Sequence, residues 1–237
     1  APRRWIITGA SRGLGRAVAE IAVQHGDKVA LLARGDETDR AAAALGGGAI
    51  ALKADVSKPE SIAAACDAAA QKWGGIDIVI NNAGLHRGGL ADKLDLADWD
   101  AVIAANLSGP FHTIRAALPH MSDGGSIVNI GAVVGFRGFA GDSPYGASKA
   151  GLSGLTQVLA VELARRGIRV NLVIPGFVST AMTAGVAEKA REKLVARIPL
   201  RREGRVEEIA RVVWWVAGST YMTGSTVATD GGLMCGL

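Results

Sequence analysis

Short apolar runs typical of strands alternate with helix-like segments along all 237 residues of the chain. The runs are continuously apolar, as in strands that are covered on both faces. Strand–helix alternation of this kind predicts a parallel sheet with right-handed crossovers. The predicted strands are Trp5–Thr8, Lys28–Ala33, Ala49–Ala54, Ile76–Asn81, Ser126–Gly131, Arg169–Ile174 and Ser225–Thr229. The predicted helices are Gly13–His25, Asp36–Leu45, Pro59–Lys72, Ala97–Met121, Ser148–Arg166 and Val206–Ala217.

No break in composition divides the chain, so we expect one α/β domain over residues 1–237, with helices on both faces of the sheet. The segment 179–202 carries small residues and charges between a strand and the last helix, and is predicted to be a mobile lid. The two longest helices, Ala97–Met121 and Ser148–Arg166, are more apolar than one sheet face requires. They are therefore expected either to contact a partner subunit or to be fully buried.

Composition excludes several classes of protein. With 49% hydrophobic and 20% charged residues, the chain can form a large core and is not disordered. The net charge of +4 comes from scattered basic residues without interleaved aromatics, which argues against nucleic-acid binding. No apolar run is long enough to cross a bilayer. Cys66 and Cys235 are far apart, which indicates a reduced cytoplasmic protein with no metal site.

A glycine-rich stretch, TGASRGLG, follows the first predicted strand. Gly9 would allow the sharp turn, Gly13 the approach of a phosphate, and Gly15 close packing of helix on strand. The stretch lacks the Gly-Lys-Ser/Thr ending of a nucleoside-triphosphatase loop. It therefore predicts a dinucleotide site. The loop residues expected to contact the dinucleotide are Gly9, Ser11, Arg12, Gly13, Leu14 and Gly15.

The end of the second strand favours NADPH over NADH. A carboxylate at this position would bind the ribose diol of NAD, but this strand ends in Arg34, and Asp36 comes later. Arg34 can pair with a 2′-phosphate, and Arg12 can approach the same group. The alternative is that both arginines are solvated surface residues.

Tyr145 and Lys149 are the candidate acid–base pair. Residues at i and i+4 share a helix face, so both side chains can reach one cleft. A tyrosine with a pKa of about 10 exchanges protons poorly near neutrality. An ammonium within about 5 Å would lower that pKa, which is the predicted role of Lys149.

Several motifs occur together and in order: TGASRGLG, NNAG at Asn81–Gly84, Asn106, YGASK at Tyr145–Lys149, PG at 175–176 and TDGG at 229–232. With them the whole chain resembles the short-chain dehydrogenase/reductase family, and within it the bacterial 3-oxoacyl-(acyl-carrier-protein) reductases and their ketone-reducing relatives. The resemblance implies a Rossmann-type sheet of about seven strands, a nicotinamide cofactor and a homotetramer.

The resemblance also implies residue roles. Tyr145 would be the general acid, Lys149 would bind the nicotinamide ribose, and Asn106 would hold a water in the proton relay. Asp55 and Val56 would contact adenine. The segments expected to line the cofactor are Asn81, Asn82, Ala83 and Gly84, and Pro175, Gly176, Val178 and Thr180.

Ala132 is the one departure from the family pattern. It lies thirteen residues before Tyr145, where the family has a serine that donates a hydrogen bond to the substrate oxygen. Losing one such donor slows catalysis by about 10²- to 10³-fold. Three explanations stay open: an engineered Ser→Ala change, another hydroxyl such as Ser143 acting instead, or a chain that keeps only cofactor binding.

The expected function is NADPH-dependent reduction of 3-oxoacyl thioesters or similar ketones. The alternatives are a reductase of small free ketones and a non-catalytic NADPH-binding module. An acyl carrier protein or coenzyme A thioester would meet basic residues at the pocket rim, for which Arg137 and Arg166 are candidates, although Asp123 argues against a carrier protein. The residues expected to line the substrate pocket are His86, Phe136, Phe139, Ser143 and Met182.

Overall fold

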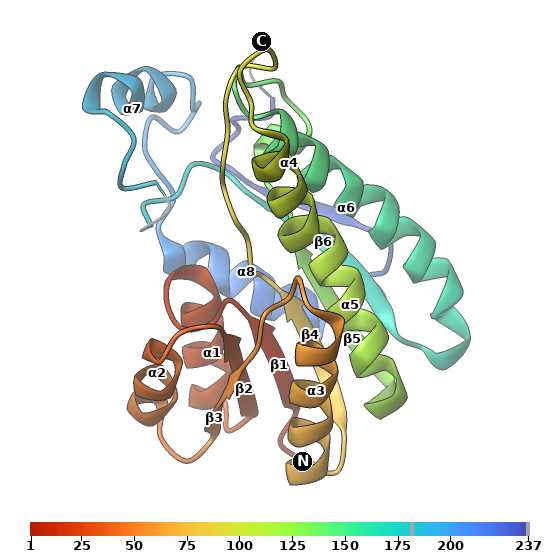
Figure 1. Ribbon diagram of the computed structural model, residues 1–237. Helices are drawn as coiled ribbons and strands as arrows, with labels where there is room; N and C mark the ends of the chain where they lie inside the picture. The colour runs from red at the N-terminus through yellow and green to blue at the C-terminus, as the bar shows by residue number, and fades with distance from the viewer. Residues whose placement is uncertain (181–182, 236–237) are drawn as a thin grey trace.

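The computed structural model describes residues 1–180 and 183–235. Seven parallel strands form one sheet in the order β3-β2-β1-β4-β5-β6-β7, which confirms the predicted architecture (Figure 1). The strands are β1 (Arg4–Thr8), β2 (Lys28–Ala33), β3 (Ala49–Lys53), β4 (Ile76–Asn81), β5 (Met121–Ile130), β6 (Arg169–Pro175) and β7 (Thr226–Thr229). The helices are α1 (Gly13–Gln24), α2 (Glu37–Leu45), α3 (Pro59–Trp73), α4 (Leu96–Ile103), α5 (Gly109–Ala117), α6 (Ser143–Glu162), α7 (Glu188–Val195) and α8 (Val206–Gly218).

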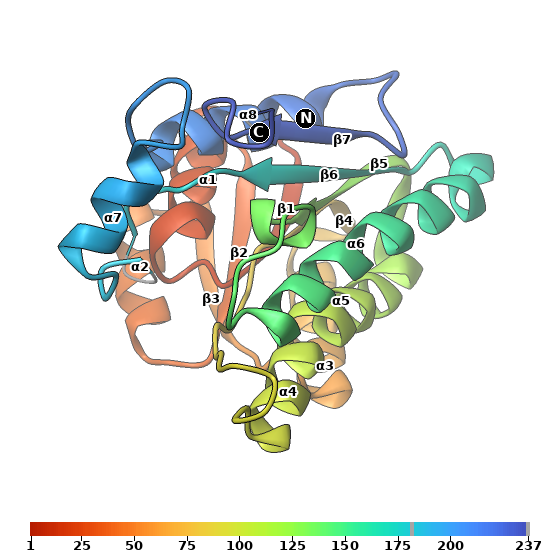
Figure 2. The same cartoon turned by 90° about the horizontal axis from the view of Figure 1, so that it is seen from above.

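Helices cover both faces of the sheet. Helices α1, α2 and α8 lie on one face and α3, α4, α5 and α6 on the other (Figures 1 and 2). Successive residues of β1 alternate between the two cores: Trp5 and Ile7 pack toward α1 and α8, and Ile6 packs toward α3 and α5. The strand order reverses between β1 and β4, so the carboxyl ends of these two strands form the crevice where sheets of this kind bind ligands.

The single helix predicted over Ala97–Met121 is wrong. The structure has α4, a π-helical turn at Ala104–Ser108, α5 and a 3₁₀ turn at Leu118–His120, and Met121 already begins β5. Pro110 has no N–H to donate to the carbonyl four residues earlier, at Asn106, which favours a wider turn there. The turn lies at a candidate site residue.

Helix α6 begins at Ser143, five residues earlier than predicted, with Pro144 in its first turn. Tyr145 and Lys149 therefore both lie near its N-terminus. Much of the surplus apolar surface of α6 faces outward, because Val158 is 55% and Val161 78% exposed. Full burial, one of the two alternatives for this helix, is thus wrong for its outer face. Among the described residues, no helix has the length and apolar character needed to span a membrane.

Candidate active site

The glycine turn after β1 is held by the segment that follows β4. Gly9 has φ 65°, and a Cβ added there would lie 2.8 Å from Ala83 Cα. The Asn82 side chain donates to the carbonyls of Thr8 (3.0 Å) and Gly9 (3.1 Å). In return, Thr8 Oγ1 accepts from the backbone N–H groups of Asn82 and Ala83, each at 3.0 Å. A Cβ on Gly15 would lie 2.5 Å from Asn82 Nδ2, so this position also needs glycine.

The N-terminus of α1 is suited to an anion. Gly13 begins the helix with φ 58°, and a Cβ there would meet nothing within 4 Å, so the backbone is open to a ligand. The N-cap, Arg12, makes no side-chain capping bond, and the first turn holds no acidic residue. Free N–H groups and the positive end of the helix dipole therefore face outward. Ser11 is half-buried beside this turn, while Leu14 packs against the core.

Arg12 and Arg34 are both exposed at the carboxyl ends of the neighbouring strands β1 and β2. Asp36, the first carboxylate after β2, forms an ion pair with Lys53. Asp55, after β3, accepts hydrogen bonds from Ser57 N–H (3.0 Å) and Oγ (2.7 Å). Burial acts to raise the Asp55 pKa, but the Ser57 bonds and the charge of Arg34 outweigh it and the pKa is lowered. The carboxyl ends of β1 and β2 therefore present the two cations Arg12 and Arg34.

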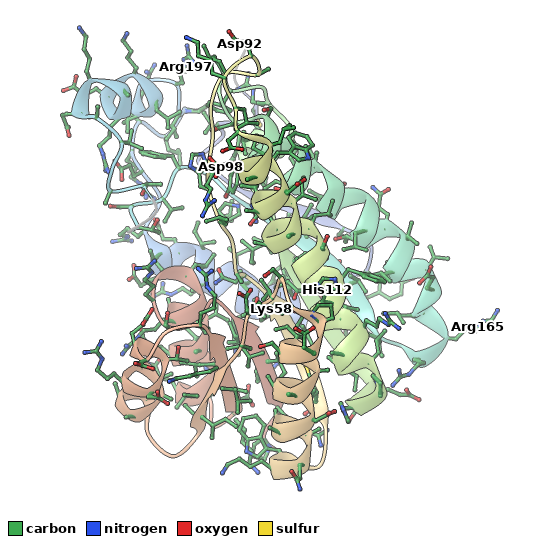
Figure 3. All side chains as sticks on the ribbon, viewed as in Figure 1. Lys58, Asp92, Asp98, His112, Arg165 and Arg197 are labelled. Carbon is green, nitrogen blue, oxygen red and sulfur yellow. The ribbon has the colours of Figure 1, made fainter. Side chains whose placement is uncertain are left out.

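The Val56 backbone is fixed from α5. A Cβ on Gly109 would lie 2.9 Å from Val56 Cβ, and His112 Nδ1 lies 3.1 Å from the Val56 carbonyl oxygen. Figure 3 labels His112 on α5 and Lys58 at the start of α3. Val56 is therefore held at the carboxyl edge of the sheet beside Asp55.

Tyr145, Lys149 and Asn106 converge at the carboxyl end of β5. Lys149 is 4% exposed, its Nζ donates to the Ile130 carbonyl (2.8 Å), and it lies 5.6 Å from the centroid of the Tyr145 ring. Asn106 Oδ1 accepts from Leu85 N–H (2.7 Å). Its Nδ2 donates to the Leu85 carbonyl (2.8 Å).

Gly84 connects these groups to the glycine turn. A Cβ on Gly84 would lie 3.6 Å from Asn106 Oδ1 and 3.9 Å from Lys149 Nζ. The predicted acid–base residues and the predicted dinucleotide loop are therefore parts of one site.

The expected lowering of the tyrosine pKa is not what the structure shows. Burial, and secondly the charge of Asp142, raise the pKa of Tyr145 to about 12. Burial lowers the pKa of Lys149 to about 8. Desolvation disfavours the charged form of both groups and is the main cause of both shifts. The protein alone thus keeps Tyr145 in the protonated form, which can donate a proton but is a weak acid.

Ala132 lies two residues beyond the last residue of β5, Ile130. Its backbone is extended (φ −163°, ψ 154°), and the 3₁₀ turn Val133–Gly135 that follows packs directly on α6. A Cβ on Gly135 would lie 2.7 Å from the backbone nitrogen of Ala150. The methyl group of Ala132 can donate no hydrogen bond. Ser143, the hydroxyl considered in its place, is exposed at the first residue of α6.

The segment after β6 is anchored to β7. Gly176 N–H donates to the Thr229 carbonyl (3.1 Å), and a Cβ on Gly176 would lie 2.5 Å from Asp230 Cα. Pro175 ends β6, Val178 is buried and pairs with Gly204, and Thr180 N–H donates to Thr183 Oγ1 (2.9 Å). These residues are held at the carboxyl edge, as the site requires.

Of the residues predicted to line a pocket, His86 lies against Tyr145, with ring centroids 5.1 Å apart. Phe136 is 40% exposed after the Val133–Gly135 turn, and Phe139 packs against the small core around Leu152. Met182 lies outside the described residues.

Arg166 is not at the pocket rim. Its guanidinium donates to the carbonyls of Leu118 (3.0 Å) and Met121 (2.5 Å) and binds Asp123. These groups surround the start of β5, whereas Tyr145 lies near its end, and the label of the neighbouring Arg165 in Figure 3 marks the same remote end of α6. Arg137 donates instead to the Leu233 carbonyl of the C-terminal segment.

Three contacts in this site could not be predicted from local sequence patterns. The Leu85 backbone as partner of Asn106, the Ile130 carbonyl as partner of Lys149, and the contact between His86 and Asp142 all join residues far apart in the chain. Thr8 did leave a signal, because it is a hydroxyl at the end of an otherwise apolar strand.

Comparison with known proteins places the chain in a family. Residues 9–234 match the family described as Enoyl-(Acyl carrier protein) reductase. The chain is 41% identical to the 3-oxoacyl-[acyl-carrier-protein] reductase FabG of Thermotoga maritima, over 97% of this chain and 96% of that protein. It is 42% identical to Carbonyl reductase family member 4 of Xenopus tropicalis, over 96% of each.

Solved structures agree. A short-chain dehydrogenase/reductase from Serratia marcescens superposes with a TM-score of 0.93 at 34% identity, over 98% of each chain. A blue fluorescent protein from a metagenomic library, solved in complex with NADPH, superposes with a TM-score of 0.92 at 35% identity, over 98% of this chain and 97% of that one. The chain therefore belongs to the short-chain dehydrogenase/reductase family of oxidoreductases.

Proposed function

We propose that the protein is an NADPH-dependent carbonyl reductase that reduces 3-oxoacyl thioesters or similar ketones to hydroxy compounds. The observation that carries the proposal is the meeting of Tyr145, buried Lys149 and Asn106 at the carboxyl end of β5, next to an uncapped glycine turn. Tyr145 provides an acid, Lys149 a cation, and the N-terminus of α1 a site for the anionic part of a cofactor. Hydride transfer from a dinucleotide to a carbonyl requires these three functions in one crevice.

The residues present fit a dinucleotide phosphate. The open backbone at Gly13 and the free N–H groups of α1 suit the pyrophosphate, and exposed Arg34 and Arg12 suit a 2′-phosphate. Asp36 is engaged by Lys53, which disfavours binding of an unphosphorylated ribose diol by this carboxylate. One structural relative was solved with NADPH, in line with this choice.

When bound, NADPH supplies a hydride to the carbonyl carbon. As the carbon–oxygen π electrons move to oxygen, Tyr145 gives its hydroxyl proton to that oxygen, so that an alcohol forms and solvent reprotonates the tyrosinate. Lys149 is fixed by the Ile130 carbonyl near the Tyr145 ring, and its ammonium, when protonated, favours the tyrosinate. Asn106 fixes Leu85 and with it the wall of the crevice.

Within the described part of the chain, the two arginines considered for a carrier-protein rim are both engaged by other groups. Arg166 is engaged at the opposite edge of the sheet and Arg137 is tied to Leu233. The named relatives include both carrier-protein and carbonyl reductases. Small free ketones are therefore the second candidate substrates, and acyl thioesters of carrier protein or coenzyme A the first.

Assembly and the lid complete the proposal. The exposed apolar residues Val158 and Val161 on α6 and Phe111 on α5 suit a twofold interface, and a second interface across the C-terminal segment would give a homotetramer.

Segment 179–202, which contains the exposed helix α7, would cover the substrate. Free Cys66 and Cys235 suit a reducing compartment, so we place the protein in the cytoplasm.

The test is NADPH oxidation with a panel of acetoacetyl thioesters and simple aryl and alkyl ketones, by the protein and by its Ala132→Ser variant. We expect ketone-dependent oxidation by at least the variant, with binding of NADPH by both. Turnover of free ketones alone would refute the thioester assignment. Tight NADPH binding with no turnover by either protein would favour a non-catalytic NADPH-binding module.

A further inference from the structure

His86 is a polar side chain beside Tyr145 that the proton transfer described above does not use. Its ring meets the Tyr145 ring edge-on, with centroids 5.1 Å apart and an interplanar angle of 77°. This arrangement is one of the two that aromatic pairs prefer. The His86 imidazole is thus part of the wall from which Tyr145 acts.

The backbone around His86 is held from two sides. Asn106 binds both the N–H and the carbonyl of the preceding residue, Leu85. Two residues after His86, a Cβ on Gly88 would lie 2.4 Å from the Gly141 carbonyl oxygen. The backbone N–H of Gly89 donates to that same oxygen (2.8 Å). The loop after β4 and the loop before α6 are therefore fastened together over the start of the catalytic helix.

The imidazole itself is fixed by Asp142. His86 Nε2 lies 2.8 Å from Asp142 Oδ1, and Asp142 is the N-cap residue of α6, three positions before Tyr145. The contact with Asp142 raises the His86 pKa. Protonated His86 gives one N–H to Asp142 and keeps a second at Nδ1, for which the described residues offer no acceptor.

Two cationic side chains close to His86 in space or in sequence, Lys149 and Arg87, are both engaged by other protein groups. Lys149 Nζ lies 5.6 Å from the centroid of the Tyr145 ring and donates to the Ile130 carbonyl. Arg87, next to His86 in the chain, is paired with Asp98 of α4 (2.7 Å). Among the described residues around this ring, protonated His86 therefore keeps one N–H that no protein group accepts.

The site lacks a donor where Ala132 stands, and the His86 side chain, 44% exposed beside the Tyr145 ring, is a donor held by Asp142. Resting on the carbonyl-reductase function proposed above, we propose that His86, held by Asp142, donates its Nδ1 hydrogen bond to the substrate oxygen that Tyr145 protonates. His86 would stabilise the charge that develops on this oxygen while giving up no proton itself. The loss of the serine hydroxyl at Ala132 is then compensated in this chain.

The test compares His86→Phe with the native protein, each with and without Ala132→Ser. Phenylalanine keeps the ring contact with Tyr145 and removes the donor. We expect His86→Phe to lower kcat by about 10²-fold when Ala132 is present and by less than about threefold when it is replaced by serine. Correspondingly, Ala132→Ser should raise kcat by less than tenfold in the native chain and by about 10²-fold in the His86→Phe chain.

The chain offers a matched control at the other end of the sheet. His120 Nε2 lies 2.7 Å from Asp67 Oδ1, the same type of contact with no tyrosine beside it, so His120→Phe should leave kcat unchanged in both backgrounds. Asp142→Asn is the second variant. It removes a charge that raises the Tyr145 pKa, which by itself would make Tyr145 a stronger acid, so a fall in kcat would come from weakened protonation of His86.

The pH profile gives an independent readout. The kcat of the native protein should fall as pH rises through the raised pKa of His86, and the fall should be smaller with Ala132→Ser. Lys149 titrates equally in both proteins. Equal losses from His86→Phe in the two backgrounds would mean a merely structural role and would overturn the proposal. If instead no variant oxidises NADPH with any ketone, the proposed function itself fails.

Discussion

At the amino edge of the sheet, charged side chains satisfy one another. Asp27 accepts from the Arg3 backbone (2.9 Å) and side chain (3.0 Å) and from the indole N–H of Trp5 (2.9 Å). In the same way Asp77 binds the Arg4 guanidinium (2.6 and 2.7 Å). At the carboxyl edge, the side chains of Arg12 and Arg34 form no ion pair or hydrogen bond within the described part of the chain.

The two edges therefore use similar residue types for different purposes: the amino edge stabilises the fold, and the carboxyl edge provides groups for a ligand. Closed networks at the amino edge stabilise the fold and leave little capacity for a ligand. At the carboxyl edge, backbone groups of Ile130 and Leu85 hold Lys149 and Asn106 in place. The arginine side chains at the same edge are left available to bind a ligand. Because parallel strands all end at this edge, one feature of topology gathers the available groups in one place. Four substitutions test this contrast.

The largest effect on stability is expected at the amino edge. Asp27→Ala leaves the buried Trp5 indole N–H and part of the Arg3 guanidinium without an acceptor. The free energy of unfolding should fall by about 3 kcal/mol, measured by urea denaturation. The rate per folded molecule should not change. A similar fall in kcat at temperatures where the variant is folded would show that the two edges are not independent.

The pH dependence of the free energy of unfolding should show how much the burial of Lys149 destabilises the fold while its amine is protonated. Its folded pKa is about 8 against 10.5 for the exposed group, so between these values the unfolded chain holds a proton that the folded chain does not. Native stability should therefore rise with pH from about 8 to 10. In Lys149→Met this rise should be smaller by on the order of 2 kcal/mol. Parallel pH–stability curves for the two proteins would show that Lys149 is not desolvated.

Arg34→Ala tests the open cation corner. A charge-assisted hydrogen bond contributes about 1.5–3 kcal/mol, so preference for NADPH over NADH should drop by about ten- to a hundredfold. Titration of cofactor fluorescence measures both dissociation constants. Arg40→Ala, which removes another exposed arginine, on α2, serves as the control and should leave the preference intact. Unchanged discrimination in Arg34→Ala would assign the phosphate to Arg12.

The smallest effect is expected where a pair lies on an exposed helix surface. Arg16 and Glu20 of α1 form an i, i+4 ion pair at 2.9 Å. Glu20→Ala should change the free energy of unfolding by less than about 0.5 kcal/mol, and less still in high salt. A loss comparable with that of Asp27→Ala would contradict the distinction between buried networks and surface pairs.

How far the sequence predicts this molecule depends on the range of each interaction. Apolar runs and the glycine turn are local patterns, and they predicted the strands and the Gly9–Gly15 turn. The π-helical turn at Ala104–Ser108 was missed although Pro110 is a local signal for it, whereas the bonds from Asn106 to Leu85 span 21 residues and leave no local pattern. Arg166 was misplaced because α6 extends about 1.5 Å per residue and carries it to the opposite edge.

The pKa values were the hardest to foresee. Spacing alone placed Tyr145 and Lys149 on one helix face, but only the packing around them shows that burial raises the pKa of Tyr145 and lowers that of Lys149. In the same way, the contact between His86 and Asp142 joins two loops that no local pattern connects.

The most direct test of the account is the rate of NADPH oxidation with a saturating ketone in a single turnover, by Ala132→Ser and by Ala132→Ser combined with Tyr145→Phe. The first variant restores the serine hydroxyl as a hydrogen-bond donor at the carboxyl edge. The second also removes the Tyr145 hydroxyl, the proton donor, and leaves the amino edge unchanged. We predict a rate about 10²- to 10⁴-fold lower for the double variant, at an unchanged urea midpoint and NADPH affinity. Equal rates in the two variants would contradict the assignment of this edge as a carbonyl-reducing site.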